Sequence, residues 1–148
     1  MDTDHVATAL RNCASGLYAA EAGVALLVSN GTFLHRYDFT SRFIEHDTSG
    51  ATPMAAIDWD AAITALANGD LPCSGGERRI LQLAASLAAG TPVSLHDTVT
   101  GLDDANIALF ITAIGHASGN DRKTAGASSS PSWKCEQAAR NPQKAMRG

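Results

Sequence analysis

The stretch Cys73–Ala117, CSGGERRILQLAASLAAGTPVSLHDTVTGLDDANIALFITAIGHA, contains the longest periodic apolar pattern of the chain. Ser74 and Glu77 have the S-x-x-E spacing of a capping box, in which each side chain accepts a hydrogen bond from the other residue's backbone N–H. The sequence therefore predicts that a helix begins at Ser74. Gly90 is typical of a helix end. Between Ser74 and Gly90 the apolar residues Ile80, Leu83, Ala84 and Leu87 form a stripe with a period of 3.6 residues.

A second helix is predicted to begin at Asp103 or Asp104, because a carboxylate accepts from the free N–H groups of a first turn and suits the helix dipole. Gly119 ends this helix. Ser94 permits a short third helix between the two long ones, with Leu95, Val99 and Leu102 expected to point inward. The inward stripe expected for the second helix consists of Ile107, Phe110, Ile111 and Ile114.

Segment 74–103 also resembles the ABC-type ATPases. Ser74-Gly-Gly-Glu-Arg-Arg is similar to their signature loop, which likewise opens a helix. Asp97 stands where their magnesium-binding Walker B aspartate would be expected, and Gly101-Leu102-Asp103 looks like a shifted D-loop. The resemblance implies a degenerate ATPase-like fragment that needs a partner for nucleotide binding.

The same segment departs from that family in three ways. Thr98 follows Asp97 where the family has a catalytic glutamate, and the expected buried strand reads Val93-Ser-Leu-His96, with two polar residues. The first lysine of the chain is Lys123, so no phosphate-binding Gly-Lys-Ser/Thr loop precedes the signature. Capping explains Ser74, Glu77, Asp103 and Asp104 without a nucleotide.

Composition indicates one helical domain and a tail. The chain has 148 residues, 45% of them hydrophobic but only 5% aromatic, and alanine supplies much of the apolar content. These features favour close-packed helices over a sheet. We predict an all-α fold, a small orthogonal helical domain of five to six helices at residues 1–118, followed by a disordered, flexible basic tail at 119–148. The tail is rich in Gly, Ser and Ala and has one isolated aromatic, Trp133.

Charge is unevenly distributed between these two parts. The whole chain has a net charge of −4, whereas residues 118–148 carry +4 and the preceding 117 residues carry −8. An acidic body disfavours nucleic-acid binding, since phosphates reward clustered Lys and Arg. A DNA-associated regulator that uses a helix-turn-helix-like segment at 80–114 and the basic tail stays an alternative. Its reading helix would present Asp103, Asp104 and Asn106 to phosphates.

Cysteines and hydropathy suggest a cytoplasmic protein without membrane spans. Cys13, Cys73 and Cys135 are odd in number and form no C-x-x-C motif, which favours free thiols in a reducing compartment. The N-terminus has no signal-peptide pattern, and the longest apolar run is too short to cross a bilayer. The alanine-rich, lysine-poor composition fits a bacterial gene.

The remaining segments predict shorter helices. Helices are expected from Thr3 or Asp4, over 17–29, and over 59–66 with Asp58 as the cap, whereas 47–55 is expected to be a loop because Gly50 and Pro53 interrupt it. The aromatic stretch 32–46 is expected to form two turns, the second capped by Asp38. Its aromatics are expected at the centre of the core, and a ligand-binding groove is the alternative.

Candidate catalytic and metal-binding residues have simpler structural interpretations. His35 and Asp38 have i, i+3 spacing, but a capping role for Asp38 is favoured over a metal site. His96 and Asp97 are adjacent and do not face each other on a helix. Asp58 and Asp60 suit a helix start. We therefore predict no catalytic residues, no metal site and no cofactor.

The function predicted from the sequence is a protein–protein interaction or regulatory module without catalysis. Its partner is expected to be another protein or a second copy of the chain, because several helices have apolar stripes that one neighbour does not cover.

Overall fold

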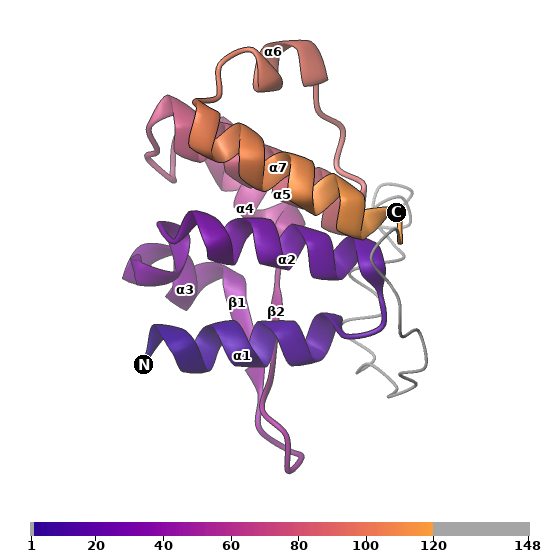
Figure 1. Ribbon diagram of the computed structural model, residues 1–148. Coiled ribbons are helices and arrows are strands. Elements are labelled where there is room, and N and C mark those ends of the chain that lie inside the picture. The colour runs from indigo at the N-terminus through magenta and orange to yellow at the C-terminus, as the bar shows by residue number, and fades with distance from the viewer. Residues whose placement is uncertain (1, 120–148) are drawn as a thin grey trace, which may run out of the picture.

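A computed structural model describes residues 2–119 of the chain. This part is a small helical domain with one short pair of strands, which confirms the predicted all-α class (Figure 1). It contains seven α-helices rather than five or six, because both short segments 37–43 and 95–99 are helical. The predicted tail lies outside the described residues, apart from Gly119. The elements in chain order are α1 (Thr3–Ala14), α2 (Tyr18–Asn30), a 3-10 turn (Phe33–His35), α3 (Tyr37–Phe43), β1 (Ile44–Asp47), β2 (Met54–Ile57), α4 (Trp59–Asn68), α5 (Gly75–Ala89), α6 (Leu95–Val99) and α7 (Asp104–Ala117).

The predicted caps set most helix starts. Ser74 and Glu77 form the complete capping box of α5, with Ser74 N donating to Glu77 Oε1 at 2.8 Å and Glu77 N to Ser74 Oγ at 3.3 Å. Asp58, Ser94 and Asp103 cap α4, α6 and α7 in the same way, each accepting from a backbone N–H three residues on. Helix α1 is capped one residue earlier than expected, at Asp2.

Helix α2 is the centre of the fold. It lies between α1 on one side and α5 and α7 on the other, and its most extensive contacts are with α5 and α7 (Figure 1). At Gly23 the backbones of α2 and α5 approach closely: a Cβ there would lie 2.6 Å from the Ala84 carbonyl oxygen and 2.7 Å from the Ala88 Cβ. Alanine at 84 and 88 and glycine at 23 together permit this close packing.

Three phenylalanines of the aromatic stretch lie in the core, as the sequence predicted, whereas Tyr37 of the same stretch is 83% exposed, contrary to that prediction. The ring centres of Phe33 and Phe39 are 5.0 Å apart, and those of Phe39 and Phe43 are 5.4 Å apart. All three side chains are buried. Tilted rings at this separation add to the free energy gained by burial.

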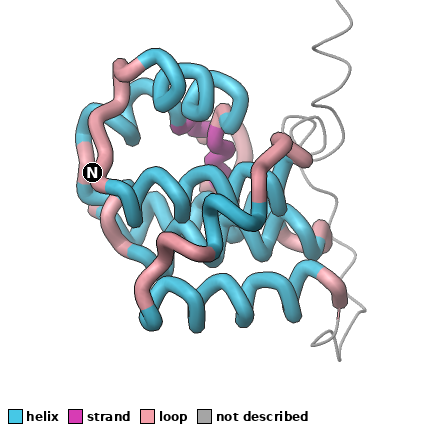
Figure 2. Tube along the Cα trace, turned by 90° about the horizontal axis from the view of Figure 1, so that it is seen from above, coloured by secondary structure: helices cyan, strands magenta, loops and turns pink. Residues whose placement is uncertain are grey.

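The antiparallel pair β1–β2 corrects the predicted loop at 47–55. The register runs from Ile44 opposite Ile57 to Asp47 opposite Met54, so only the residues between the two strands form the loop. In Figure 2 the strands are the short magenta segment beside the helices. Strand β2 packs against α1 and buries Ala55 and Ile57 there. This tertiary contact stabilises a pairing that local composition does not favour.

Candidate functional site

Segment 74–103 contains helix caps and helices, with no strand at the aspartate. Residues 91–94 are irregular, Ser94 caps α6, and Asp97 is an exposed residue in the first turn of α6. The Asp97 backbone N–H donates to Ser94 Oγ at 3.3 Å. A Walker B aspartate would instead end a buried strand, so the structural basis for the resemblance is limited to a capped helix start at Ser74.

The His35–Asp38 pair does not form a site, and Asp38 is not a cap. Helix α3 begins after Arg36, whose Nε donates to Asp38 Oδ1 at 3.0 Å. This hydrogen bond and the charge of Arg36 hold the pKa of the Asp38 carboxyl below its usual value. His35 Nδ1 lies 3.4 Å from the hydroxyl of Thr3. The predicted capping role of Asp38 is therefore wrong. The residue at the N-cap position of α3 is Arg36, and the Asp38 carboxylate binds the guanidinium of Arg36 instead.

The cysteines do not behave alike. Cys73 is a free, partly buried thiol, and Arg36 donates to its sulfur at 3.6 Å. Burial raises the pKa of this thiol, and the hydrogen bond from Arg36 opposes the rise. Cys13 is disulfide-bonded, so the prediction of free thiols is wrong for this residue. An odd number of cysteines means that at least one of them is unpaired, but it does not exclude a disulfide between two others.

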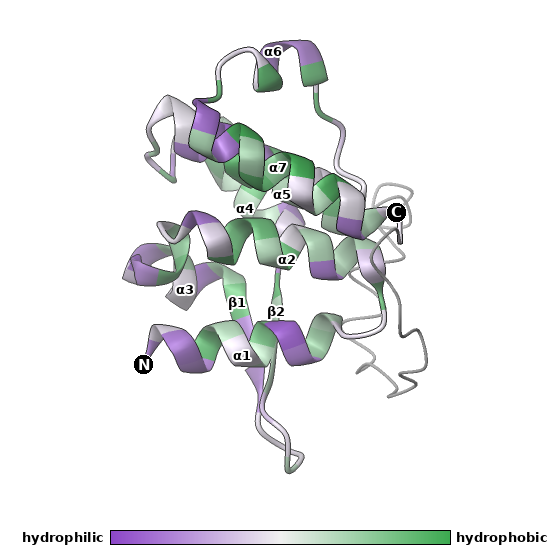
Figure 3. Ribbon diagram, in the orientation of Figure 1, coloured by the Kyte–Doolittle hydropathy of each residue, from purple (hydrophilic) through white to green (hydrophobic). Residues whose placement is uncertain are grey.

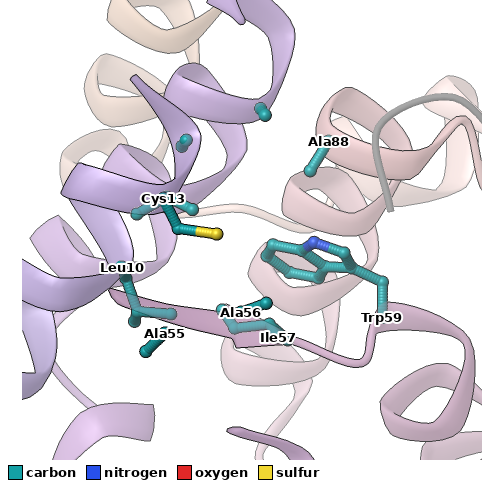
Figure 4. A pocket seen from close by; sticks show the side chains of 10 residues that line it. Leu10, Cys13, Ala55, Ala56, Ile57, Trp59 and Ala88 are labelled. Carbon is teal, nitrogen blue, oxygen red and sulfur yellow. The ribbon is translucent and has the colours of Figure 1, made fainter. Parts of the chain in front are cut away.

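An apolar pocket lies between α1, α2, β2, α4 and α5. Cys13 and Trp59 point toward each other across it (Figure 4). Its free volume is about 30 Å³, which holds one or two water molecules. Such a pocket is too small for a cofactor and has no polar side chain other than the indole. Its lining consists of Leu10, Cys13, Ala14, Ala20, Val24, Ala55, Ala56, Ile57, Trp59 and Ala88.

A wider groove of about 470 Å³ runs along α4. Three carboxylates, those of Asp58, Asp60 and Asp70, lie along it with Arg42. Asp58 is occupied as the α4 cap and accepts from Ala61 N at 3.0 Å. Between residues 2 and 119 no three His, Cys, Asp or Glu side chains are placed to hold a metal ion. The groove is thus an open, solvated acidic surface.

Helix α7 is attached to α2 through its inner face. Phe110 and Ala113 are buried in the core. One polar contact secures each end: Asn30 Nδ2 donates to Asn106 Oδ1 at 3.1 Å, and His116 Nε2 lies 2.6 Å from Glu21 Oε1. These contacts fix the rotation of α7 about its axis, and so determine which residues face outward.

The outward side of α7 is apolar. Ile111 is 63% exposed and Ile114 is 46% exposed, the largest exposed apolar side chains of this helix. Most of the α7 ribbon has the apolar colour in Figure 3, and in Figure 2 α7 is the lowest helix, with no other helix outside it. We use the name α7 face for Ile107, Ala108, Ile111, Ile114 and Gly115, which are exposed or partly exposed.

The sequence prediction placed part of this face in the core. Phe110 is buried as expected, but Ile111 and Ile114, which were expected to point inward with it, are exposed, and Ala113 is buried instead. Leu95 of α6, also expected inward, is 56% exposed, while Thr98 is buried and donates to the Ser94 carbonyl. The sequence of α7 is apolar on nearly all sides of the helix, so its pattern alone does not determine which side faces the core.

No protein family, curated protein or solved structure gives a significant match to this chain. Within the described part of the chain, no helix is both long and apolar enough to cross a bilayer.

Proposed function

We propose that this protein is a non-catalytic protein–protein interaction module and that the α7 face is its binding surface. The observation that carries the proposal is the exposure of Ile111 and Ile114 on one side of a helix whose side chains are uncharged from residue 105 to residue 115. Depletion of charge around exposed aliphatic side chains is typical of the centre of an interface.

The exposed part of Ile111 and Ile114 can contribute free energy to binding. Covering an isoleucine side chain contributes about 1.5–3 kcal/mol through the apolar area removed from water. Because Ile111 is 63% exposed and Ile114 is 46% exposed, only about half of this free energy is still available at each, so the two together would supply about 1.5–3 kcal/mol before the cost of association is subtracted. The contacts of Asn106 and His116 with α2 keep α7 in place, so little free energy is needed to order it on binding.

The enzyme and DNA-binding alternatives have less support. Ser74, Asp58 and Asp103 are all engaged in helix caps, and among the described residues no three His, Cys, Asp or Glu side chains are placed to hold a metal ion. No Lys or Arg occurs between residues 80 and 119, so a reading helix there would lack phosphate contacts.

The cytoplasmic and bacterial assignments stay predictions from composition. A disulfide at Cys13 is more typical of an oxidising compartment. Alkylation of thiols during lysis, followed by mass spectrometry, tests the location: a reduced Cys13 in fresh lysate supports the cytoplasm, and an oxidised Cys13 contradicts it.

Photo-crosslinking tests the binding surface. A photoreactive amino acid replaces Ala108 on the α7 face in the full chain, and the control replaces Ala67, an exposed alanine on α4. In cells that naturally contain the protein, irradiation is expected to give a protein adduct of defined mass at position 108 and not at 67. Equal adduct formation at both positions, or none at either, would refute the proposal.

A further inference from the structure

We propose that the partner that covers the α7 face is a second copy of this chain, with the two α7 helices packed antiparallel about a two-fold axis near Ile111. This inference depends on the proposed function and names its partner. Three features of α7 support it: the acidic residues at its start, a glycine that the described fold does not require, and the order of large and small residues along the face, to which that glycine contributes.

Charge favours the antiparallel direction. Asp103 and Asp104 stand at the start of α7, and the rest of the helix has no acidic side chain. A parallel pair would bring the two acidic ends together. An antiparallel pair separates them by roughly 20 Å, the length of a 14-residue helix at 1.5 Å per residue, and aligns the helix dipoles favourably.

Gly115 is the second feature. Glycine inside a helix lowers stability relative to alanine, so a reason for it is expected. Gly23 has such a reason, since a Cβ there would collide with α5. A Cβ at Gly115, by contrast, would meet no neighbouring atom within 4 Å among the described residues. The fold of residues 2–119 therefore does not require Gly115, whereas a glycine at this position would permit close approach of a helix from outside.

The order of side chains is self-complementary about Ile111. In an antiparallel pair centred there, residues whose numbers lie equally far on either side of 111 face each other. Ile114 then faces Ala108 of the second copy, and Ile107 faces Gly115, so each large side chain meets a small one. Ile111 faces its own counterpart on the axis. A symmetric interface needs this kind of self-complementarity.

The size of the face predicts weak association. A single pair of 14-residue helices is at the small end of specific interfaces, which commonly bury about 1,200 Å² or more in total. The chain should therefore exchange between monomer and dimer with concentration instead of forming a permanent dimer.

Sedimentation velocity on the full chain tests the dimer. The sedimentation coefficient of the wild type is expected to rise with concentration. Ile111→Glu places two carboxylates against each other on the axis and should weaken association at least tenfold. Ala67→Glu adds the same charge on α4 and should leave association unchanged. Circular dichroism confirms that both variants are folded.

Cysteine cross-linking tests the direction of packing, in a Cys73→Ser background, with linked peptides identified by mass spectrometry. Under mild oxidation Ile111→Cys should link to itself. Ala108→Cys should link to Ile114→Cys in a mixture of the two variants, and poorly to itself. Efficient self-linking of Ala108→Cys together with no mixed product would mean parallel packing and would overturn the proposal.

The two proposals can fail separately. If the chain stays monomeric at every concentration while photo-crosslinking at position 108 gives an adduct with another protein, the second-copy inference is wrong and the interaction function stands. If the chain is monomeric and position 108 gives no adduct, both are wrong.

Discussion

The close contact between α2 and α5 predicts that Gly23 cannot be replaced by alanine without loss of stability, whereas Gly115 on α7 can. Gly23→Ala would place a methyl group 2.6 Å from the Ala84 carbonyl oxygen and 2.7 Å from the Ala88 Cβ, and both distances are shorter than real Cβ atoms tolerate. The obstacles are backbone and a short alanine side chain, so no flexible group can move aside. The two helices must separate instead.

The magnitude follows from two opposing effects. Forcing an extra methyl group into a close-packed contact costs about 1–3 kcal/mol, while replacing glycine by alanine inside a helix returns up to about 1 kcal/mol. We expect the free energy of unfolding of Gly23→Ala to fall by about 1–2 kcal/mol. At about 4 °C per kcal/mol for a domain of this size, its Tm should fall by about 4–8 °C.

Gly115→Ala is the matched control, because the same substitution meets open space there. Only the helix propensity changes, so the free energy of unfolding should rise by about 0.5 kcal/mol. Urea unfolding followed by circular dichroism, at a concentration below that of self-association, measures both variants. If Gly23→Ala is as stable as the wild type, or if both variants shift in the same direction, the packing argument is wrong.

Three further predictions concern single groups. Ser74→Ala removes the hydroxyl of the capping box and should lower the free energy of unfolding by about 1 kcal/mol, whereas Ser74→Asp should retain most of it, as measured by urea unfolding. Phe39→Ala, in the centre of the aromatic cluster, should cost about 3–5 kcal/mol and lower the Tm more than any surface substitution. Alkylation of Cys73 should require a higher pH than a free thiol, because burial raises its pKa, and Arg36→Gln should shift the alkylation midpoint higher still. The Cys73 thiol ionises at a lower pH in the unfolded chain than in the folded one, so the free energy of unfolding should fall as the pH rises past the ordinary thiol pKa. An alkylation midpoint at or below that of a model thiol would contradict the raised pKa of Cys73.

Local rules predicted where the helices begin and end. Ser74, Asp58 and Asp103 cap helices because a side-chain oxygen satisfies backbone N–H groups within three residues, and that chemistry is encoded in adjacent sequence. The β1–β2 pair was missed for the opposite reason. Met54–Ile57 forms a strand because it packs on α1, forty residues earlier in the chain, and no local pattern carries that information.

Helical periodicity, which predicted the helices, did not predict the exposed α7 face. Periodicity showed that α7 is helical, but Ile107, Phe110, Ile111 and Ile114 fit two different inward faces. In the structure the face with Phe110 and Ala113 is buried, and the hydrogen bond from Asn30 to Asn106 holds α7 in that rotation. Two isoleucines were thereby left exposed. A helix that is apolar on nearly all sides and lies at the edge of the fold has one side that the other described residues do not cover. That uncovered side, together with a glycine that the fold of residues 2–119 does not need, is the reason to look for a second α7 on the outer side.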